Sequence, residues 1–295
     1  MGGSGKSITL ISAAKVNLYL EVKGSLPDGY HDLVMLNTGV DLLDTVEVTL
    51  TAGDGIEIEC AHPDVPEDET NLCHKAARFF FEAYPELKSG VKIWIDKAIP
   101  VAGGLGGGSG NAAAVLVGLN ELSGSCAENP SLMHIGMKVG ADVPFFLYKS
   151  PAWAAGKGEV LSPAPCLPDW IYVVGAFNFG VSAGWAYDRF DLTGGVKKVS
   201  LNYLESGEVP PLSDVWRNDL NAVVESEYPV ISRAVSLLLE AGAEGAMMSG
   251  SGPTVFGVFS DELSAERGIA SLGEIPDIKA LTARGISGPV IRIVS

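Results

Sequence analysis

Two charged residues lie in apolar stretches of the sequence, where an ionised side chain needs a partner or a role. Lys15 follows Ala13 and Ala14, and Asp142 lies in the mostly apolar segment 140–147. An unpaired charge in apolar surroundings is costly, so such groups are candidates for a functional site. The alternatives are a lysine on a half-exposed strand and an aspartate at a turn before Pro144.

Asn17 accompanies Lys15 in the strand predicted over residues 8–22. Residues two apart in a strand project from the same face, so the ammonium and the amide are expected on one side of the sheet. A lysine on that face is interpreted as a charge directed into a site.

A turn signal, Pro27-Asp28-Gly29, precedes Tyr30 and His31. The pair combines a flat aromatic ring with an imidazole that offers a donor and an acceptor. Such a pair suits stacking on a planar base and hydrogen bonding to its edge. The alternative is an ordinary loop with a packed tyrosine.

The segment Pro100–Gly110 has six glycines in eleven residues. A strand is predicted before it at 91–95, and the sequence after it is typical of a helix. Glycine lets backbone N–H groups converge, and a helix start adds unpaired N–H groups and partial positive charge. The segment therefore predicts an anion site, most simply for a nucleotide phosphate. A plain turn would not need six glycines.

Two common phosphate motifs do not fit this loop. It lacks the lysine of a P-loop, and Gly5-Lys6-Ser7 is expected to be a flexible leader. The dinucleotide-binding pattern is matched only by Gly108-x-Gly110-x-x-Ala113, with Glu128 as a ribose contact, which is a weak signal.

The composition and net charge of the chain exclude several classes of binding partner. The chain has 295 residues and a formal net charge of −16, which argues against nucleic-acid and anionic-membrane binding. No apolar run is long enough for a membrane span, and no signal peptide is recognised. The expectation is therefore a cytoplasmic protein with free, buried thiols. Cysteine and histidine spacing predicts no protein-built metal site.

The remaining elements place this loop within a two-domain α+β chain. A domain boundary is predicted near the end of the Pro-rich segment 151–168, which gives domains 8–165 and 166–295. Further strands are predicted at 41–50, 55–60, 171–177 and 254–259, and helices at 71–84, 131–140 and 229–240, with another opening at 217–221 and one following 181–187.

A second glycine-rich segment, Met248–Pro253, lies in the second domain. It could be a simple hairpin connection. Two glycine loops in separate domains fit better with both loops closing on one polyphosphate.

These motifs together resemble the GHMP kinases. Pro100-x-x-x-Gly104-Leu105-Gly106 with Ser109 is similar to that superfamily's ATP loop. Five further segments, in the same order along almost the whole chain, are similar to one branch, which phosphorylates a cytidine diphosphate-linked methylerythritol. They are 14–18, 27–31, 140–146, 218–220 and 248–252.

The resemblance implies a fold and a set of roles. The fold would be the GHMP kinase two-domain α+β fold, with an amino-terminal domain like ribosomal protein S5 domain 2 and a ferredoxin-like carboxy-terminal domain. The chain would use ATP and Mg²⁺ and act on a small molecule. Asp142 would be the general base and Lys15 its partner.

The resemblance also implies binding residues. ATP would contact Asn71, Leu72, Lys97, Pro100, Val101, Ala102, Gly103, Gly104, Leu105, Gly106, Gly107, Gly108, Ser109 and Gly110. The substrate would contact Asn17, Tyr30, His31, Tyr187, Ser249, Gly250, Ser251 and Gly252, with the cytosine read by Tyr30 and His31 and covered on its other face by Tyr187.

The chain departs from the family pattern at Ala102, Gly110, Ala183 and Ala176–Phe179. Gly110 stands where a second serine is frequent. Three alternatives stay open: another small-molecule kinase of the superfamily, a nucleotide-binding sensor without chemistry, and a dehydrogenase.

Overall fold

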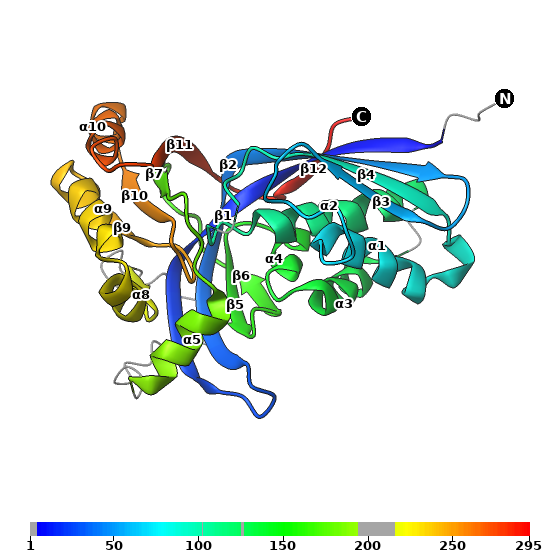
Figure 1. The fold of residues 1–295 in the computed structure, drawn as a ribbon, viewed down its shortest axis with the longest axis horizontal. Helices are drawn as coiled ribbons and strands as arrows, with labels where there is room; N and C mark the ends of the chain where they lie inside the picture. The colour runs from blue at the N-terminus through cyan, green and yellow to red at the C-terminus, as the bar shows by residue number, and fades with distance from the viewer. Residues whose placement is uncertain (1–4, 102, 125–126, 194–215) are drawn as a thin grey trace.

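One long β-hairpin runs through the whole molecule in the computed structural model, which describes residues 5–101, 103–124, 127–193 and 216–295 (Figure 1). Strand β1 (Ser7–Ser25) pairs antiparallel with β2 (His31–Thr51) almost from end to end. The middle of β1 is buried on both faces, because layers of side chains pack on it from both sides. The hairpin is therefore the frame on which the two halves of the chain are built.

The first half is a sheet covered by helices. Helices α1–α4 lie together on one face of β1, β2 and β4 (Figure 1). The strands that join β1 and β2 here are β3 (Ile56–Cys60), β4 (Gly90–Asp96), β5 (Ala152–Gly156), β6 (Val160–Pro163) and β12 (Ile291–Ile293). The helices are α1 (Leu72–Ala83), α2 (Gly107–Leu122), α3 (Asn129–Val139) and α4 (Val143–Leu147), with a 3₁₀ turn at Pro85–Leu87.

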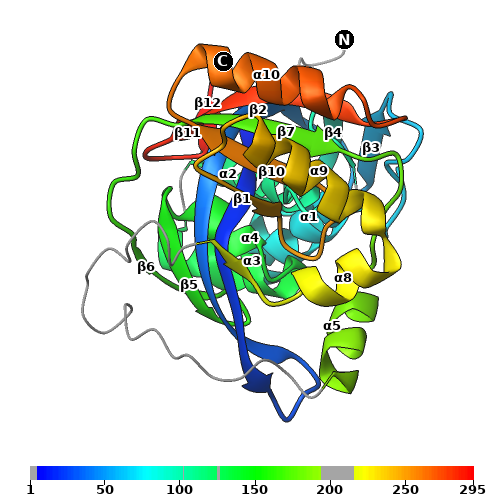
Figure 2. The same cartoon turned by 90° about the vertical axis from the view of Figure 1, so that its left-hand side faces the viewer.

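The second half repeats this layering on the other side of the hairpin. Its strands are β7 (Ile171–Ala176), β9 (Gly245–Met248), β10 (Val255–Phe259) and β11 (Lys279–Ile286), and the two-residue strand β8 (Arg217–Asn218) joins β1. Its helices are α5 (Ala183–Leu192), α8 (Asn221–Glu227), α9 (Pro229–Glu240) and α10 (Glu262–Leu272). Figure 2 shows α9 and α10 side by side over these strands.

Strand β11 connects the two halves through backbone pairing. It pairs with β2 at one end and with β7 along the rest, which gives the order β12-β1-β2-β11-β7-β10-β9. A third apolar cluster, which includes Leu18, Trp153 and Phe256, lies between the halves. Paired strands and a shared apolar layer thus join the two halves.

Most predicted elements are present, and several boundaries differ. The strand predicted to begin at Asp41 begins at His31, because residues 31–40 pair with β1 and with β5. Gly5–Ser7 is not a leader: Ser7 opens β1, and the Lys6 carbonyl accepts a hydrogen bond from Leu50 N. The helix predicted at Arg217 begins only at Asn221, because Arg217 and Asn218 pair with β1.

The expectation of buried thiols is wrong for one cysteine. Cys73 is buried and Cys60 is half-buried, but Cys166 is exposed. Cys126 lies outside the described residues. Among the described helices, none is both long and apolar enough to span a membrane.

Candidate active site

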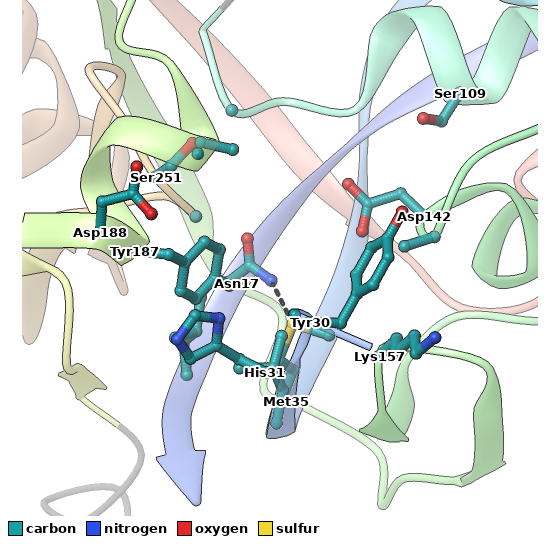
Figure 3. Close-up of a pocket in the computed structure, with 18 of the residues that line it drawn as sticks. Asn17, Tyr30, His31, Met35, Ser109, Asp142, Lys157, Tyr187, Asp188 and Ser251 are labelled. Carbon is teal, nitrogen blue, oxygen red and sulfur yellow. Dashed lines mark hydrogen bonds between the residues drawn. The ribbon is translucent and has the colours of Figure 1, made fainter. Parts of the chain in front are cut away.

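A cavity of about 470 Å³ lies where the hairpin, the glycine loop and α5 meet (Figure 3). Eight of the predicted site residues outside the ATP loop line it, and they come from both halves of the chain. They are Lys15, Asn17, Tyr30, His31, Asp142, Tyr187, Gly250 and Ser251. The sequence positions that were expected to act together are therefore together in space.

Lys15 is held between two oxygen-bearing partners on the floor of this cavity. Its Nζ lies 2.7 Å from Asn17 Oδ1 and 3.5 Å from Asp142 Oδ2. The residue is 4% exposed, so the ammonium acts in a low-dielectric setting where its charge is felt strongly. Lys15 lines the cavity, as its interpretation as a charge directed into a site requires, and its role stays a prediction.

Asp142 is the residue before the first turn of α4. The helix is anchored by buried Val143, Phe145 and Phe146, so its start is fixed against the core. The Asp142 side chain is 37% exposed and makes no side-chain cap of α4. One carboxylate therefore faces the cavity with an ammonium beside it.

Asn17 links this pair to the rest of the hairpin. Its Nδ2 donates to Asn37 Oδ1 at 2.6 Å on the neighbouring strand and also contacts Met35 Sδ. Its Oδ1 is already taken by Lys15. The amide is therefore fully oriented and fixes the position of the ammonium.

A second cavity of about 310 Å³ adjoins the first and holds the glycine loop. Its lining includes Asn71, Leu72, Lys97, Pro100, Val101 and every residue from Gly103 to Ser109. Two of the predicted ATP contacts are not part of this lining. Ala102 lies outside the described residues, and Gly110 is buried within α2 and does not line either described cavity. Gly104 and Ser109 line both cavities, so the two spaces meet there.

The glycine loop is fastened directly to the strand that carries Lys15. Lys15 N donates to the Leu105 carbonyl at 2.9 Å. Gly106 precedes α2 with φ of 70°, and a Cβ there would lie 2.8 Å from Phe146 Cζ and 2.9 Å from Lys15 Cγ. Only glycine satisfies both the backbone and the space, so the start of α2 packs closely against the Lys15 side chain.

Lys97 is engaged in a buried ion pair. Its Nζ lies 2.7 Å from Asp44 Oδ2 and 2.7 Å from the Ile99 carbonyl, and Asp44 accepts two further backbone N–H groups. Burial lowers the pKa of Lys97, although Asp44 acts against that shift. The lysine shapes the wall of the second cavity and holds a buried carboxylate.

Aromatic and charged side chains gather at the far end of the first cavity. His31 stacks on Tyr187 with ring centroids 4.6 Å apart, and Lys157 Nζ lies 4.3 Å from the centre of the Tyr30 ring. Figure 3 shows Tyr187 with His31 on one side and Tyr30 with Lys157 on the other. As the rings stand, a base has no room between His31 and Tyr187. Burial raises the pKa of Tyr187, so its phenol stays neutral.

The second glycine loop connects β9 to β10 as a hairpin and also contacts the first glycine loop. Gly250 and Ser251 line the first cavity. Ser249 is buried beneath them, where its hydroxyl accepts from Asn17 N at 3.3 Å and donates to the Gly104 carbonyl. Gly252 does not line either described cavity.

Sequence reasoning missed several residues of the site. Asn111 in α2 lines the second cavity with a buried amide oxygen that has no partner among the described residues. Lys157 and Asp188 line the first cavity. Asn111 could have been found as a polar residue within an alanine-rich helix. A lysine between Gly156 and Gly158 carries no comparable signal.

Comparisons with known proteins agree with this arrangement. The model for the GHMP kinases N terminal domain matches residues 71–150, and that for the GHMP kinases C terminal domain matches residues 211–276. The 4-diphosphocytidyl-2-C-methyl-D-erythritol kinase of Geobacter metallireducens is 41% identical over 95% of this chain and 99% of its own length. That of Geobacter sulfurreducens is 44% identical over 89% of this chain and 93% of its own length.

The chain therefore belongs to the GHMP kinases, and the predicted fold is confirmed. A solved 4-(cytidine 5'-diphospho)-2C-methyl-D-erythritol kinase superposes with a TM-score of 0.75 at 31% identity, covering 95% of this chain and 100% of that one. Homoserine kinase from Cytophaga hutchinsonii has a TM-score of 0.76 at 17% identity, covering 100% and 99%, which shows the shared fold alone.

The dinucleotide-binding alternative is wrong. Gly108, Gly110 and Ala113 all lie within α2 and form no loop that could hold a pyrophosphate. The dehydrogenase alternative rested on that pattern alone and is therefore excluded. The family matches identify the chain as a kinase.

Proposed function

We propose that this chain transfers the γ-phosphoryl group of ATP to the 2-hydroxyl of 4-diphosphocytidyl-2-C-methyl-D-erythritol, in the non-mevalonate route to isoprenoid precursors. The relatives that carry this name share about four-tenths of their residues with the chain over almost its whole length. The observation that carries the proposal is the Lys15–Asp142 pair, 3.5 Å apart, beside the junction of two cavities.

ATP would occupy the second cavity. Backbone N–H groups at the start of α2 suit phosphate oxygens, because they are unpaired and carry partial positive charge. The unpartnered Asn111 amide oxygen suits an amino group of the nucleotide. The γ-phosphate would then reach Ser109, which both cavities share.

The acceptor alcohol would lie against Asp142 in the first cavity. Asp142 would accept its proton as the oxygen attacks the γ-phosphorus. Lys15 would pair with Asp142 and stabilise the negative charge that develops on the transferring group. Asn17 and Asn37 would hold Lys15 in place through their hydrogen bonds.

Mg²⁺ would enter with ATP as part of that substrate. The described residues hold no cluster of three His, Cys, Asp or Glu side chains. The donors beside the cavity junction are the Ser109 hydroxyl and the Asp142 carboxylate. Hard oxygen ligands of this kind, with nucleotide oxygens and water, fit Mg²⁺.

The cytidine end of the substrate would lie between Tyr30 and Tyr187, whose rings face the cavity from opposite sides. Base–aromatic stacking contributes about 1–3 kcal/mol per base. The diphosphate would pass Gly250 and Ser251. We also propose the division into domains 8–165 and 166–295, with the ATP loop in the first and these two residues in the second. We propose the cytoplasm as the location.

A coupled assay with ATP, Mg²⁺ and the cytidyl substrate tests the proposal. We expect one phosphate to be transferred per ATP consumed. The competing function is another small-molecule kinase of the superfamily, so homoserine, mevalonate and methylerythritol phosphate without the cytidyl group are the matched controls. Equal turnover of any of these would contradict the role given to Tyr30 and His31.

A further inference from the structure

The second glycine loop has two backbone N–H groups that no part of the described chain uses. Gly250 and Ser251 both line the first cavity, and among the described residues neither N–H has a hydrogen-bond partner. The N–H groups on either side are occupied, because Ser249 N donates to the Thr254 carbonyl and Gly252 N donates to the Ser249 carbonyl. Unpaired backbone N–H groups in a turn suit an anion, so their direction matters for a diphosphate.

Asn218 fixes the direction of one of these two donors. Its Nδ2 donates to the Gly250 carbonyl at 2.8 Å, and that carbonyl belongs to the peptide group that carries the Ser251 N–H. The Gly250–Ser251 peptide is trans, so its C=O and N–H point in opposite directions. Asn218 is buried and does not line the first cavity. The hydrogen bond therefore turns the Ser251 N–H away from this buried amide, to the opposite side of the loop.

Asn218 is itself held by the residues on either side of it. Strand β8 pairs with β1 at two positions, and the side chains of Arg217 and Asp219 reinforce that short pairing. The Asp219 carboxylate accepts two bonds from Arg217, at 2.7 and 3.1 Å, and a third from Val22 N at 2.9 Å. Arg217 Nη1 lies 3.2 Å from Glu21 Oε1. Both neighbours of Asn218 are thus clamped on the same stretch of β1.

This clamp is a buried charge network remote from both cavities. The side chains of Glu21 and Asp219 are each 3% exposed. Buried carboxylates depend on their partners, because an unpaired buried charge is costly. Neither Arg217 nor Asp219 lines either of the two cavities of the site, so any effect of the clamp on a ligand is indirect.

We propose that Asp219 is a positioning residue for the substrate diphosphate, which acts through Asn218 on the direction of the Ser251 N–H. With the clamp in place, Asn218 holds the peptide plane and the N–H is ready for a phosphate oxygen. Without it, Asn218 shifts on β1 and the peptide rotates, while Lys15 and Asp142 stay where they are. The inference rests on the proposed function, since it assumes that the diphosphate of the substrate lies against this loop.

Calorimetric binding of CDP and CMP tests the proposal without any turnover. The two ligands share the base, the sugar and one phosphate, and CDP alone carries the second phosphate. Asp219→Asn keeps the shape of the side chain and removes its charge. We expect it to reduce the preference for CDP over CMP by about tenfold, in keeping with the loss of one hydrogen bond to a charged group. An unchanged preference would overturn the proposal.

Asp261→Asn is the matched control. Its carboxylate lies in the same half of the chain and likewise accepts from a backbone N–H and a side chain, both of Ser264. It lines neither cavity of the site, so its CDP-to-CMP ratio should equal that of the wild type. An equal fall in both variants would reduce the effect to general destabilisation. If Asp219→Asn does not fold, Arg217→Lys replaces it, because lysine keeps the charge and loses the two-bond contact; the same fall is expected, and its absence counts against the proposal.

A double variant tests the route from Asp219 to the loop. If Asp219 acts through Asn218, adding Asp219→Asn to Asn218→Ala changes the CDP-to-CMP ratio no further, whereas independent effects multiply. Multiplied effects would refute this route. In the kinase assay, Asp219→Asn should raise KM for the cytidyl substrate and leave kcat and the KM for ATP unchanged, which a loss of folded enzyme would not do.

The binding and kinetic outcomes distinguish this inference from the proposed function. If Asp219→Asn lowers the CDP-to-CMP ratio but the wild type phosphorylates none of the tested alcohols, the kinase assignment fails and the role of Asp219 stands. If the wild type phosphorylates the cytidyl substrate while Asp219→Asn keeps both the ratio and the KM, the kinase assignment stands and the role of Asp219 fails.

Discussion

The hydroxyl of Ser249 lies 3.2 Å from the carbonyl oxygen of Gly104, and this contact joins the two glycine loops. The same hydroxyl accepts from Asn17 N on β1. One buried serine therefore touches the ATP loop and the strand that carries Lys15. The wall between the two cavities is assembled from both halves of the chain, and it depends on close backbone approach.

Replacing Gly104 with alanine should disrupt that wall. Gly104 has φ of +76°, and a Cβ there would lie 2.4 Å from the Ser249 carbonyl oxygen. We expect a loss of about 1–3 kcal/mol in the free energy of unfolding from backbone strain, and loss of turnover from the displaced loops. Urea unfolding and the kinase assay measure the two effects.

Gly53→Ala is the matched control for Gly104→Ala. Gly53 has φ of +98° but no neighbour within 4 Å of the added Cβ, so it carries backbone strain without a clash. It should lose stability and keep full turnover. Normal turnover in Gly104→Ala would show that the loop contact is unimportant.

Asp142→Asn should bind ATP and transfer no phosphate at a measurable rate. The amide cannot accept the proton of the alcohol, and removing a general base reduces kcat by about two to four orders of magnitude. Equilibrium binding of ATP and single-turnover kinetics separate binding from chemistry. Retained turnover would show that another group accepts the proton.

Asn218 should control the shape of the second glycine loop. Its Nδ2 donates to the Met248 and Gly250 carbonyls at 2.9 and 2.8 Å. Asn218→Ala leaves these acceptors without partners, which costs about 1–3 kcal/mol of stability. We also expect KM for the diphosphate-bearing substrate to rise, because Gly250 and Ser251 line its cavity.

Asn120→Ala controls for the stability effect alone. Asn120 makes a comparable pair of hydrogen bonds, to the Ala127 amide and carbonyl, and it lines neither described cavity. It should lose similar stability with an unchanged KM. If both variants raise KM alike, the effect of Asn218 is general destabilisation.

Ser12 explains why this chain has glycine at position 110. A Cβ on Gly110 would lie 2.4 Å from Ser12 Oγ, a buried hydroxyl without a partner among the described residues. Gly110→Ser should therefore cost about 1–3 kcal/mol through overpacking. Adding Ser12→Ala should recover most of that loss in a double-mutant cycle, and purely additive effects would contradict the account.

The Asp28–Lys157 ion pair should respond to acid. The hydrogen bond from Lys157 lowers the pKa of Asp28. A carboxyl with a lowered folded-state pKa contributes stability above its unfolded pKa, and that contribution is lost as pH falls through the folded value. Carbon-13 titration of the carboxyl should show the low pKa in the wild type and its return to the ordinary value in Lys157→Met. An unchanged pKa in the variant would show that Lys157 is not the cause.

Local pattern predicted most of the elements, because period and turn chemistry are local. Lys15 and Asn17 follow from strand alternation, and the helix after the glycine loop follows from composition. The helix predicted to open at 217–221 begins only at Asn221, because Asn218 and Asp219 bond to segments far away in the sequence. Such tertiary hydrogen bonds leave no local signal.

The site residues that lie in short segments similar to the family's loops could be predicted from the sequence. His31 stacks directly on Tyr187 and forms a hydrogen bond with Asp191. Both contacts depend on where α5 packs against the start of β2. No spacing connects residue 31 with residue 191. The same holds for Ser12 and Gly110, which meet only when β1 and α2 pack together.

The hairpin of β1 and β2 constrains how this protein works. Both strands pass through both halves, and β11 ties β2 to β7. For the halves to swing apart, ladder hydrogen bonds would have to break. The ammonium and carboxylate are thus set in place once, during folding, and each substrate enters an already assembled cleft with little reorganisation left for the reaction itself.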